Sequence, residues 1–243
     1  MARIGSKKSQ SKKTSENVSE EPQNIELPTS NLGLIDRKSW IKREPVTELG
    51  HRIVSAAIEE FATKGIFNAR VAEITKKAQT TDPAFYWYFA GMKQAALFIM
   101  SEYYWAPLNI RLNHYLQITN DPKQLFDAVI QALIQSTTDN PSHPWLSESK
   151  VFNIVVAQMR NPALLPESML DAEYVTFVNK LGEIVELGQK QKLFSSWLRP
   201  ELVARLIVNN LHSLLTTNNI ALQNSVEKDE VIKVVEKLLG MTN

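Results

Sequence analysis

The spacing of apolar residues changes sharply near position 45. Before that point Ser, Lys, Glu, Asn and Pro dominate, and apolar residues do not recur at any period that would bury one face. We therefore expect residues 1–43 to form a disordered, basic and polar tail. Within it, the stretch from Leu32 to Trp40 has enough apolar residues to dock locally.

Beyond Pro45 apolar residues recur at steps of three and four, as they do on one face of an α-helix. This pattern predicts a first helix over 47–64. Thr47 offers a hydroxyl that can cap the start of the helix, and Gly65 follows as the residue that can end it in a left-handed conformation.

A second, shorter helix is predicted over 70–78, and a tight break follows it. Thr81, Asp82 and Pro83 then combine a capping hydroxyl, an acid in the first turn and a proline where no amide partner is required. A third helix is therefore expected to begin there and to run to Phe89.

The remainder of the chain continues as helices separated by prolines. A long helix is predicted over 91–117, with Pro107 either dividing it, acting as a hinge or leaving a static kink. Later prolines mark further breaks, and the apolar periods between them show no strand alternation. We predict an all-α fold, with one small domain at 44–92 and a larger helical domain at 93–243.

Composition narrows the class of protein. With 243 residues and 44% hydrophobic content, the chain can bury a sizeable core. It has no apolar run of about 18 residues, and its N-terminus is polar, so we expect no membrane contact and a cytoplasmic location. The absence of cysteine removes disulfides and thiolate metal sites.

The sequence offers no constellation for catalysis. Its four histidines are scattered, with no HExxH pair, no cysteine partner and no glycine-rich phosphate loop after a strand. We expect no enzyme activity, no metal and no cofactor, although a carboxylate site without a motif stays open as an alternative.

Two short helices joined by a tight turn have the dimensions of a helix-turn-helix. The stretch IVSAAIEEFATKGIFNARVAEITKKAQTTDPAFYWYFAGMKQAAL resembles the N-terminal domain of the TetR family of regulators, and the resemblance spans about Leu49 to Leu97. The positions that carry it are Ala57, Phe61, Lys64, Gly65, Val71, Ile74, Ala78, Tyr86, Trp87, Tyr88 and Phe89.

The resemblance implies a ligand-responsive transcriptional repressor that binds a palindromic double-stranded DNA operator as a homodimer. The later stretch VELGQKQKLFSSWLRPELVARLIVNNLHSLL resembles the last core helices of the family, which pack against their symmetry mates. The candidate DNA contacts are Thr47, Arg70, Thr80, Thr81, Ala84, Phe85, Tyr86, Trp87 and Lys93. Tyr86 would offer its hydroxyl to a phosphate, Trp87 would lie against a base edge or sugar, and Lys93 would pair with a phosphate.

Three positions depart from the family pattern. Gln79 stands where glycine is common, Ala69 stands where threonine is common, and Lys93 follows one residue late, after Met92. These departures motivate an alternative, a dimeric scaffold or binding protein on the same fold without sequence-specific DNA binding. The basic start of the tail, with Arg3, Lys7, Lys8, Lys12 and Lys13, either contacts DNA phosphates as an extra arm or is simply solvated.

Aromatic residues are numerous in the larger domain, and most of them must be core. Ligand sites in helical proteins form between helices from mostly apolar side chains with a few polar groups. Tyr104, Phe126, Phe152 and Phe177 are the candidates for lining such a pocket, and the expected effector is a small, largely apolar molecule.

Overall fold

Helices make up nearly all regular structure in the part of the chain that the computed structural model describes, which is residues 33–220, 233, 235–237 and 239–240. Two isolated β-bridges occur among these residues, and none of them forms a strand. The all-α prediction is confirmed. The five N-terminal cations lie outside the described residues.

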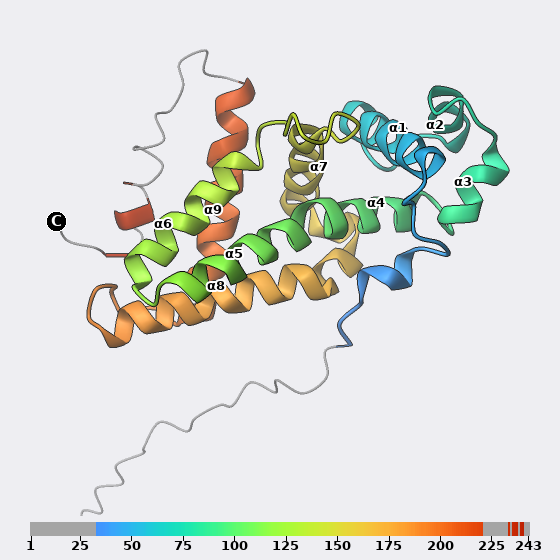
Figure 1. Ribbon diagram of the computed structural model, residues 1–243. Coiled ribbons are helices and arrows are strands. Elements are labelled where there is room, and N and C mark those ends of the chain that lie inside the picture. Colours follow the sequence, from blue (N-terminus) through green and yellow to red (C-terminus); the bar gives the residue numbers. More distant parts are fainter. Residues whose placement is uncertain (1–32, 221–232, 234, 238, 241–243) are drawn as a thin grey trace, which may run out of the picture. The chain divides into compact units, whose positions relative to one another are not determined.

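The first helices gather at one end of the described fold, in the order drawn in Figure 1. They are the 3-10 turn η1 (Arg37–Trp40), α1 (Glu48–Lys64), α2 (Val71–Lys77), α3 (Asp82–Tyr88) and α4 (Met92–Met100). The others are the π-helical segment η2 (Ser101–Trp105), α5 (Ala106–Ile118), α6 (Pro122–Gln135), α7 (Glu148–Arg160), the 3-10 turns η3 (Pro162–Leu164) and η4 (Pro166–Leu170), α8 (Ala172–Lys190) and α9 (Pro200–Ile220). None of the helices among the described residues is both long and apolar enough to cross a membrane.

The three helices before α4 form where the sequence predicts them. The Thr47 hydroxyl accepts a hydrogen bond from the Gly50 N–H at 3.1 Å, which caps α1, and Gly65 ends that helix with a φ of 78°. The buried face of α1, with Ile53 and Phe61, packs in one apolar core with Ile74 of α2. Burial of this face stabilises all three helices, because a helix as short as α2 is marginal by itself.

The long helix predicted over 91–117 is continuous but changes its winding. Five residues, Ser101–Trp105, form a π-helical segment between α4 and α5, and Pro107 is the second residue of α5. Proline has no N–H for the carbonyl four residues before it, and its ring crowds that carbonyl, so a wider turn relieves the conflict. The irregularity therefore precedes Pro107 instead of following it.

The helices from η2 to α9 surround an aromatic core in which His212 of α9 is buried. The His212 Nδ1 lies 2.6 Å from the Val208 carbonyl, so it carries the proton and donates. The Tyr104 hydroxyl then donates to His212 Nε2 at 2.6 Å. Burial lowers the pKa of His212 to about 4, so the imidazole is neutral at pH 7.

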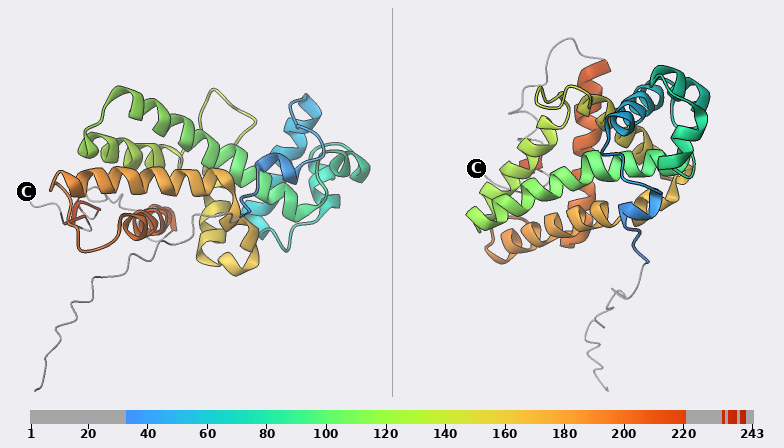
Figure 2. Two further views of the ribbon diagram at one scale, coloured as in Figure 1. Left: turned by 90° about the horizontal axis from the view of Figure 1, so that it is seen from below. Right: turned by 45° about the vertical axis from the view of Figure 1, so that its right-hand side comes forward.

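Residues 33–43, which the apolar pattern assigns to a disordered tail, are packed against the rest of the described fold. Trp40 is buried, and Ile35 forms a parallel bridge with Asp171 while Ile41 forms an antiparallel bridge with Phe89. Both views in Figure 2 show this segment between the α1–α3 end and the start of α8. The local docking expected for the stretch from Leu32 to Trp40 is seen in its described residues, 33–40, and the packed segment extends beyond it to Arg43. We call residues 33–43 the strap.

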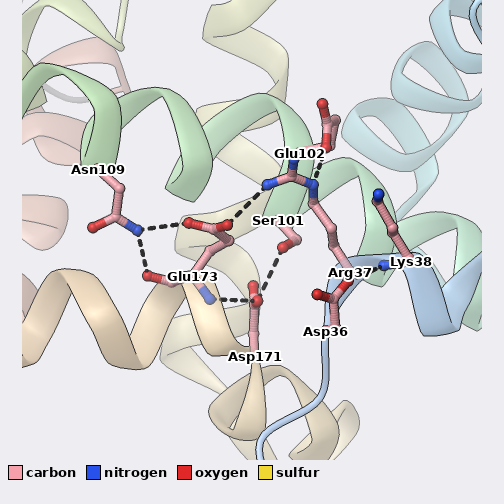
Figure 3. A network of polar contacts seen from close by, with 8 residues as sticks. All are labelled: Asp36, Arg37, Lys38, Ser101, Glu102, Asn109, Asp171 and Glu173. Carbon is pink, nitrogen blue, oxygen red and sulfur yellow. Dashed lines mark hydrogen bonds and ion pairs between the residues drawn. The ribbon is translucent and has the colours of Figure 1, made fainter.

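A polar network fastens the strap to η2 and to the start of α8 (Figure 3). The Arg37 guanidinium pairs with Glu102 at 2.5 Å and with Glu173 at 2.8 Å. The Asn109 amide donates to the Glu173 backbone carbonyl and to its carboxylate. Asp171 accepts from the Ser101 hydroxyl and caps α8. The strap is thus held both by η2 and by the start of α8.

Candidate DNA-binding surface

The turn between α2 and α3 is built on Gln79, which adopts the left-handed conformation with a φ of 52°. The Thr80 N–H donates to the Thr75 carbonyl at 2.9 Å and the Gln79 N–H donates to the Lys76 carbonyl at 3.2 Å. This pair of bonds is a Schellman motif, which ends a helix with one left-handed residue. Glutamine therefore takes the conformation for which the family pattern uses glycine, and the turn keeps its shape.

Asp82 braces the start of α3 against α2. Its carboxylate accepts a hydrogen bond from the Thr75 hydroxyl at 2.6 Å, and Thr75 is buried. An acid at this position also suits the positive end of the helix dipole. The sequence leaves open whether Asp82 would repel phosphates, and in the structure its carboxylate holds the start of α3 to α2 through this hydrogen bond.

A second acid, Glu60 of α1, holds α2 in place. Glu60 is buried, and its carboxylate pairs with Lys77 at 2.8 Å and with Lys64 at 3.0 Å. The hydrogen bond from Lys77 is the main cause that lowers the pKa of Glu60. Lys77 is therefore a bracing residue between α1 and α2.

The two faces of α3 differ in character. Phe85 and Tyr88 are buried, whereas Tyr86 is 45% exposed and Trp87 is 56% exposed. Phe85 is a candidate DNA contact in the sequence, but its ring is fully covered and packs against Phe89 at a centroid distance of 5.5 Å. Its position three residues before Tyr88 places it on the inner face. Phe85 is thus a core residue and not an accessible contact.

The remaining candidates lie at the helix starts. Arg70, the residue before α2, and Thr81, the residue before α3, are both exposed and make no side-chain capping bond. Thr80 and Ala84 are partly exposed beside them. These four side chains and the outer face of α3 belong to one helix-turn-helix.

Two of the candidate DNA contacts, Thr47 and Lys93, bond to other residues of the chain. The Thr47 hydroxyl caps α1 and lies 2.8 Å from the Tyr88 hydroxyl, so it links α1 to the inner face of α3. Lys93 pairs with Glu167 of η4 at 2.5 Å, and this pair lowers the pKa of Glu167. The Glu167 carboxylate therefore offsets the positive charge that Lys93 would offer to a phosphate.

Two cations that sequence reasoning missed lie beside α3. The Lys42 N–H donates to the Tyr88 carbonyl at 2.7 Å, and its ammonium donates to the Tyr86 carbonyl at 3.1 Å. The Arg43 guanidinium carbon lies 4.7 Å from the centre of the Trp87 ring. Both residues stand at the end of the strap, in a polar stretch without periodicity, so the apolar pattern gives no signal for them.

The pocket candidates fall in two groups. Phe126, Phe152 and Phe177 are fully buried within the aromatic core. Tyr104 is also buried, but it lines a cavity of about 240 Å³ at the junction of η2, α5 and the loop before α7. Other residues that line this cavity are Tyr103, Pro107, Arg111, Ser136 and Trp145.

The cavity is in contact with α1 through Trp145. The Tyr103 ring meets the Trp145 ring edge-on at 5.6 Å. On its other side Trp145 stacks on His51 of α1, with 4.2 Å between ring centres and an angle of 4° between planes. Two aromatic contacts therefore join the cavity wall to α1.

Comparison with known proteins agrees with this geometry. Residues 53–97 match the family model of the bacterial regulatory proteins of the tetR family. These residues contain most of α1, all of α2 and α3 and the start of α4. A search of curated protein sequences gives no match.

Solved structures share the fold over most of their length. The fatty acid degradation regulator FadR from Bacillus halodurans is 18% identical, with a TM-score of 0.66 over 82% of this chain and 97% of its own. FadR from Bacillus subtilis in complex with stearoyl-CoA is 18% identical, with a TM-score of 0.63 over 79% of this chain and 98% of its own. AibR in complex with isovaleryl coenzyme A and operator DNA is 16% identical, with a TM-score of 0.60 over 78% of this chain and 97% of its own. Residues 53–97 are thus similar to the tetR family of bacterial regulatory proteins, and the chain shares the fold of these solved structures.

Proposed function

We propose that this chain is a cytoplasmic transcriptional regulator that reads DNA with α3. The observation that carries the proposal is the two-sided character of that helix, with Phe85 and Tyr88 packed inward and Tyr86 and Trp87 turned outward. A recognition helix of this kind enters the major groove and presents its outer side chains to bases and backbone.

The exposed side chains would contact different parts of the DNA. The Tyr86 hydroxyl is suited to a phosphate oxygen, and Trp87 to a base edge, a sugar or a thymine methyl group. Arg70 and Thr81 lie at helix starts, where backbone N–H groups and the helix dipole favour phosphate. Asp82 has a role within the motif, where its carboxylate accepts a hydrogen bond from the Thr75 hydroxyl.

We propose further that the regulator acts as a homodimer on a palindromic operator. Leu202 and Leu206 lie one turn apart on the outer face of α9, with 41% and 39% of their surface exposed, and Trp197 before α9 is exposed as well. A second copy that covers this face would bury apolar surface in a two-fold interface. Half-sites would then lie about 34–36 Å apart.

Regulation would come from a small effector in the cavity beside Tyr104. The FadR structure from Bacillus subtilis holds stearoyl-CoA and the AibR structure holds isovaleryl coenzyme A. A cavity of about 240 Å³ lies below the range of roughly 300–1,000 Å³ for drug-sized ligands, so it suits a smaller, largely apolar molecule. Such a molecule would press on Tyr103 and Trp145 and would shift α1, which releases DNA from a repressor.

The test is a DNA selection from a random duplex library with the purified full chain. We expect a palindromic motif that Tyr86→Ala and Trp87→Ala both abolish. The control is Lys123→Ala, which removes an exposed side chain from the start of α6. No enriched motif, or a motif that is indifferent to both α3 substitutions, would contradict the proposal and favour a dimeric scaffold on the same fold.

A further inference from the structure

The strap ends beside the outer face of α3, and we propose that Lys42 and Arg43 bind DNA phosphates and extend the interface beyond the helix-turn-helix. This inference rests on the proposed function. It adds a second, separate segment of chain to the DNA-binding surface.

Lys42 is fixed at the C-terminal end of α3. Its backbone N–H donates to the Tyr88 carbonyl at 2.7 Å and its ammonium donates to the Tyr86 carbonyl at 3.1 Å. Carbonyls in the last turn carry the negative end of the helix dipole, so a cation is favourable there. The ammonium group has three donors and uses one in this bond, which leaves two for a phosphate.

Arg43 lies against the side chain that is the strongest candidate for a base or sugar contact. Its guanidinium carbon is 4.7 Å from the centre of the exposed Trp87 ring, within the range of a cation–π contact. Such a contact uses the charge of the guanidinium and leaves its N–H donors unused. Those donors form the planar fork that matches a phosphate group.

Carboxylates do not neutralise this pair of cations. Neither Lys42 nor Arg43 forms an ion pair within the part of the chain that the structure describes. The adjacent Glu44 is exposed and forms no ion pair with either cation among the described residues. The two positive charges therefore stay available on the α3 side of the strap.

The strap is held at its other end, so the two cations are already in position before DNA arrives. The Ile35 N–H donates to the Leu170 carbonyl at 2.8 Å, and the Ala172 N–H donates to the Ile35 carbonyl at 3.1 Å. Trp40 is buried between these anchors and α3. A segment that is ordered in advance loses little conformational entropy on binding, and this favours affinity.

The experiment measures affinity against salt concentration for the full chain on its selected operator. Each phosphate contact contributes about 0.9 to the slope of log K against log[salt], so Arg43→Met should lower that slope by about 1.8 for a dimer on two half-sites. Lys42→Met should give a similar decrease, and each variant should bind about tenfold more weakly. Arg43→Lys keeps the charge and should restore most of the slope.

Lys38→Met is the matched control. It removes one exposed cation from the same strap, but Lys38 makes no hydrogen bond or ion pair with α3. We expect its slope to equal that of the unaltered chain. Thermal unfolding of every variant verifies that the strap variants are folded.

The outcomes separate this inference from the proposed function. An unaltered chain without sequence-selective affinity overturns both. If the unaltered chain binds selectively but Arg43→Met and Lys42→Met keep its salt slope, the phosphate contacts are refuted and the regulator stands. If Arg43→Met binds more weakly but keeps the salt slope of the unaltered chain, the phosphate contact is also refuted, because Arg43 would then only position Trp87.

Discussion

Replacing Asp171 with asparagine should make the protein more stable at pH 8 and should remove a pH dependence from its folding. Asp171 is buried where the strap meets α8, and its carboxylate accepts hydrogen bonds from the Ser101 hydroxyl at 2.9 Å and from the Glu173 N–H at 3.0 Å (Figure 3). Asparagine keeps an oxygen acceptor for both bonds and remains a good helix cap. The substitution therefore removes the charge with little change in shape.

The magnitude follows from the pKa. Burial raises the pKa of Asp171 from 3.8 to about 7; the nearby Glu173 raises it further, while Arg37 opposes the shift. Because the folded state holds the proton more tightly, stability is highest at low pH and falls as pH rises from about 4 to about 7. With about 1.4 kcal/mol for each tenfold change, the native protein should gain about 2.5 kcal/mol between pH 8 and pH 5 from this group.

Urea unfolding at pH 5 and pH 8 measures this effect. Because asparagine stays neutral in both states, Asp171→Asn should exceed the native protein by about 4 kcal/mol at pH 8 and by about 1.5 kcal/mol at pH 5. Asp36→Asn is the control, since Asp36 caps η1 with an exposed side chain. A variant that is less stable than the native protein at both values would refute the reasoning, because the carboxylate would then supply a needed charge.

Three further substitutions test the local geometry. Gln79→Gly should stabilise the protein by about 1 kcal/mol in thermal unfolding, since glycine adopts a φ of 52° without the cost of a Cβ, and a loss of stability would contradict the left-handed turn. Gly50→Ala should destabilise it by about 1–3 kcal/mol in urea unfolding, since a Cβ there lies 2.7 Å from Pro45 backbone atoms, and an unchanged midpoint would contradict that close approach. Phe85→Ala should cost about 3–5 kcal/mol while Trp87→Ala costs little, and equal losses would refute the assignment of the two faces of α3.

The sequence predicts the helix-turn-helix well because local signals and burial agree there. Thr47 and Gly65 mark the ends of α1, and Pro83 marks the start of α3, as expected. Apolar residues at steps of three and four also place Ile53 and Ile74 in the core. The prediction that Phe85 contacts DNA is wrong. The seven residues of α3 form both the exposed face and the face buried in the core, and Phe85 belongs to the buried face.

Other features depend on contacts between distant parts of the chain. Trp40 has no apolar neighbours at a helical period, and its burial depends on sites more than 40 residues away. The pairing of Lys93 with Glu167 spans 74 residues and gives no local signal. The π-helical segment before Pro107 is a response to the missing N–H, and proline alone does not reveal on which side the helix will adjust.

The central claim is that α3 reads DNA sequence with its outer face. The most direct measurement compares the affinity of the full chain for its selected duplex and for a scrambled duplex of equal length and composition, at one salt concentration. We predict a preference of about 10³ or more for the native chain and its loss in the folded Trp87→Ala variant. Equal affinity of the native chain for the two duplexes would contradict the claim.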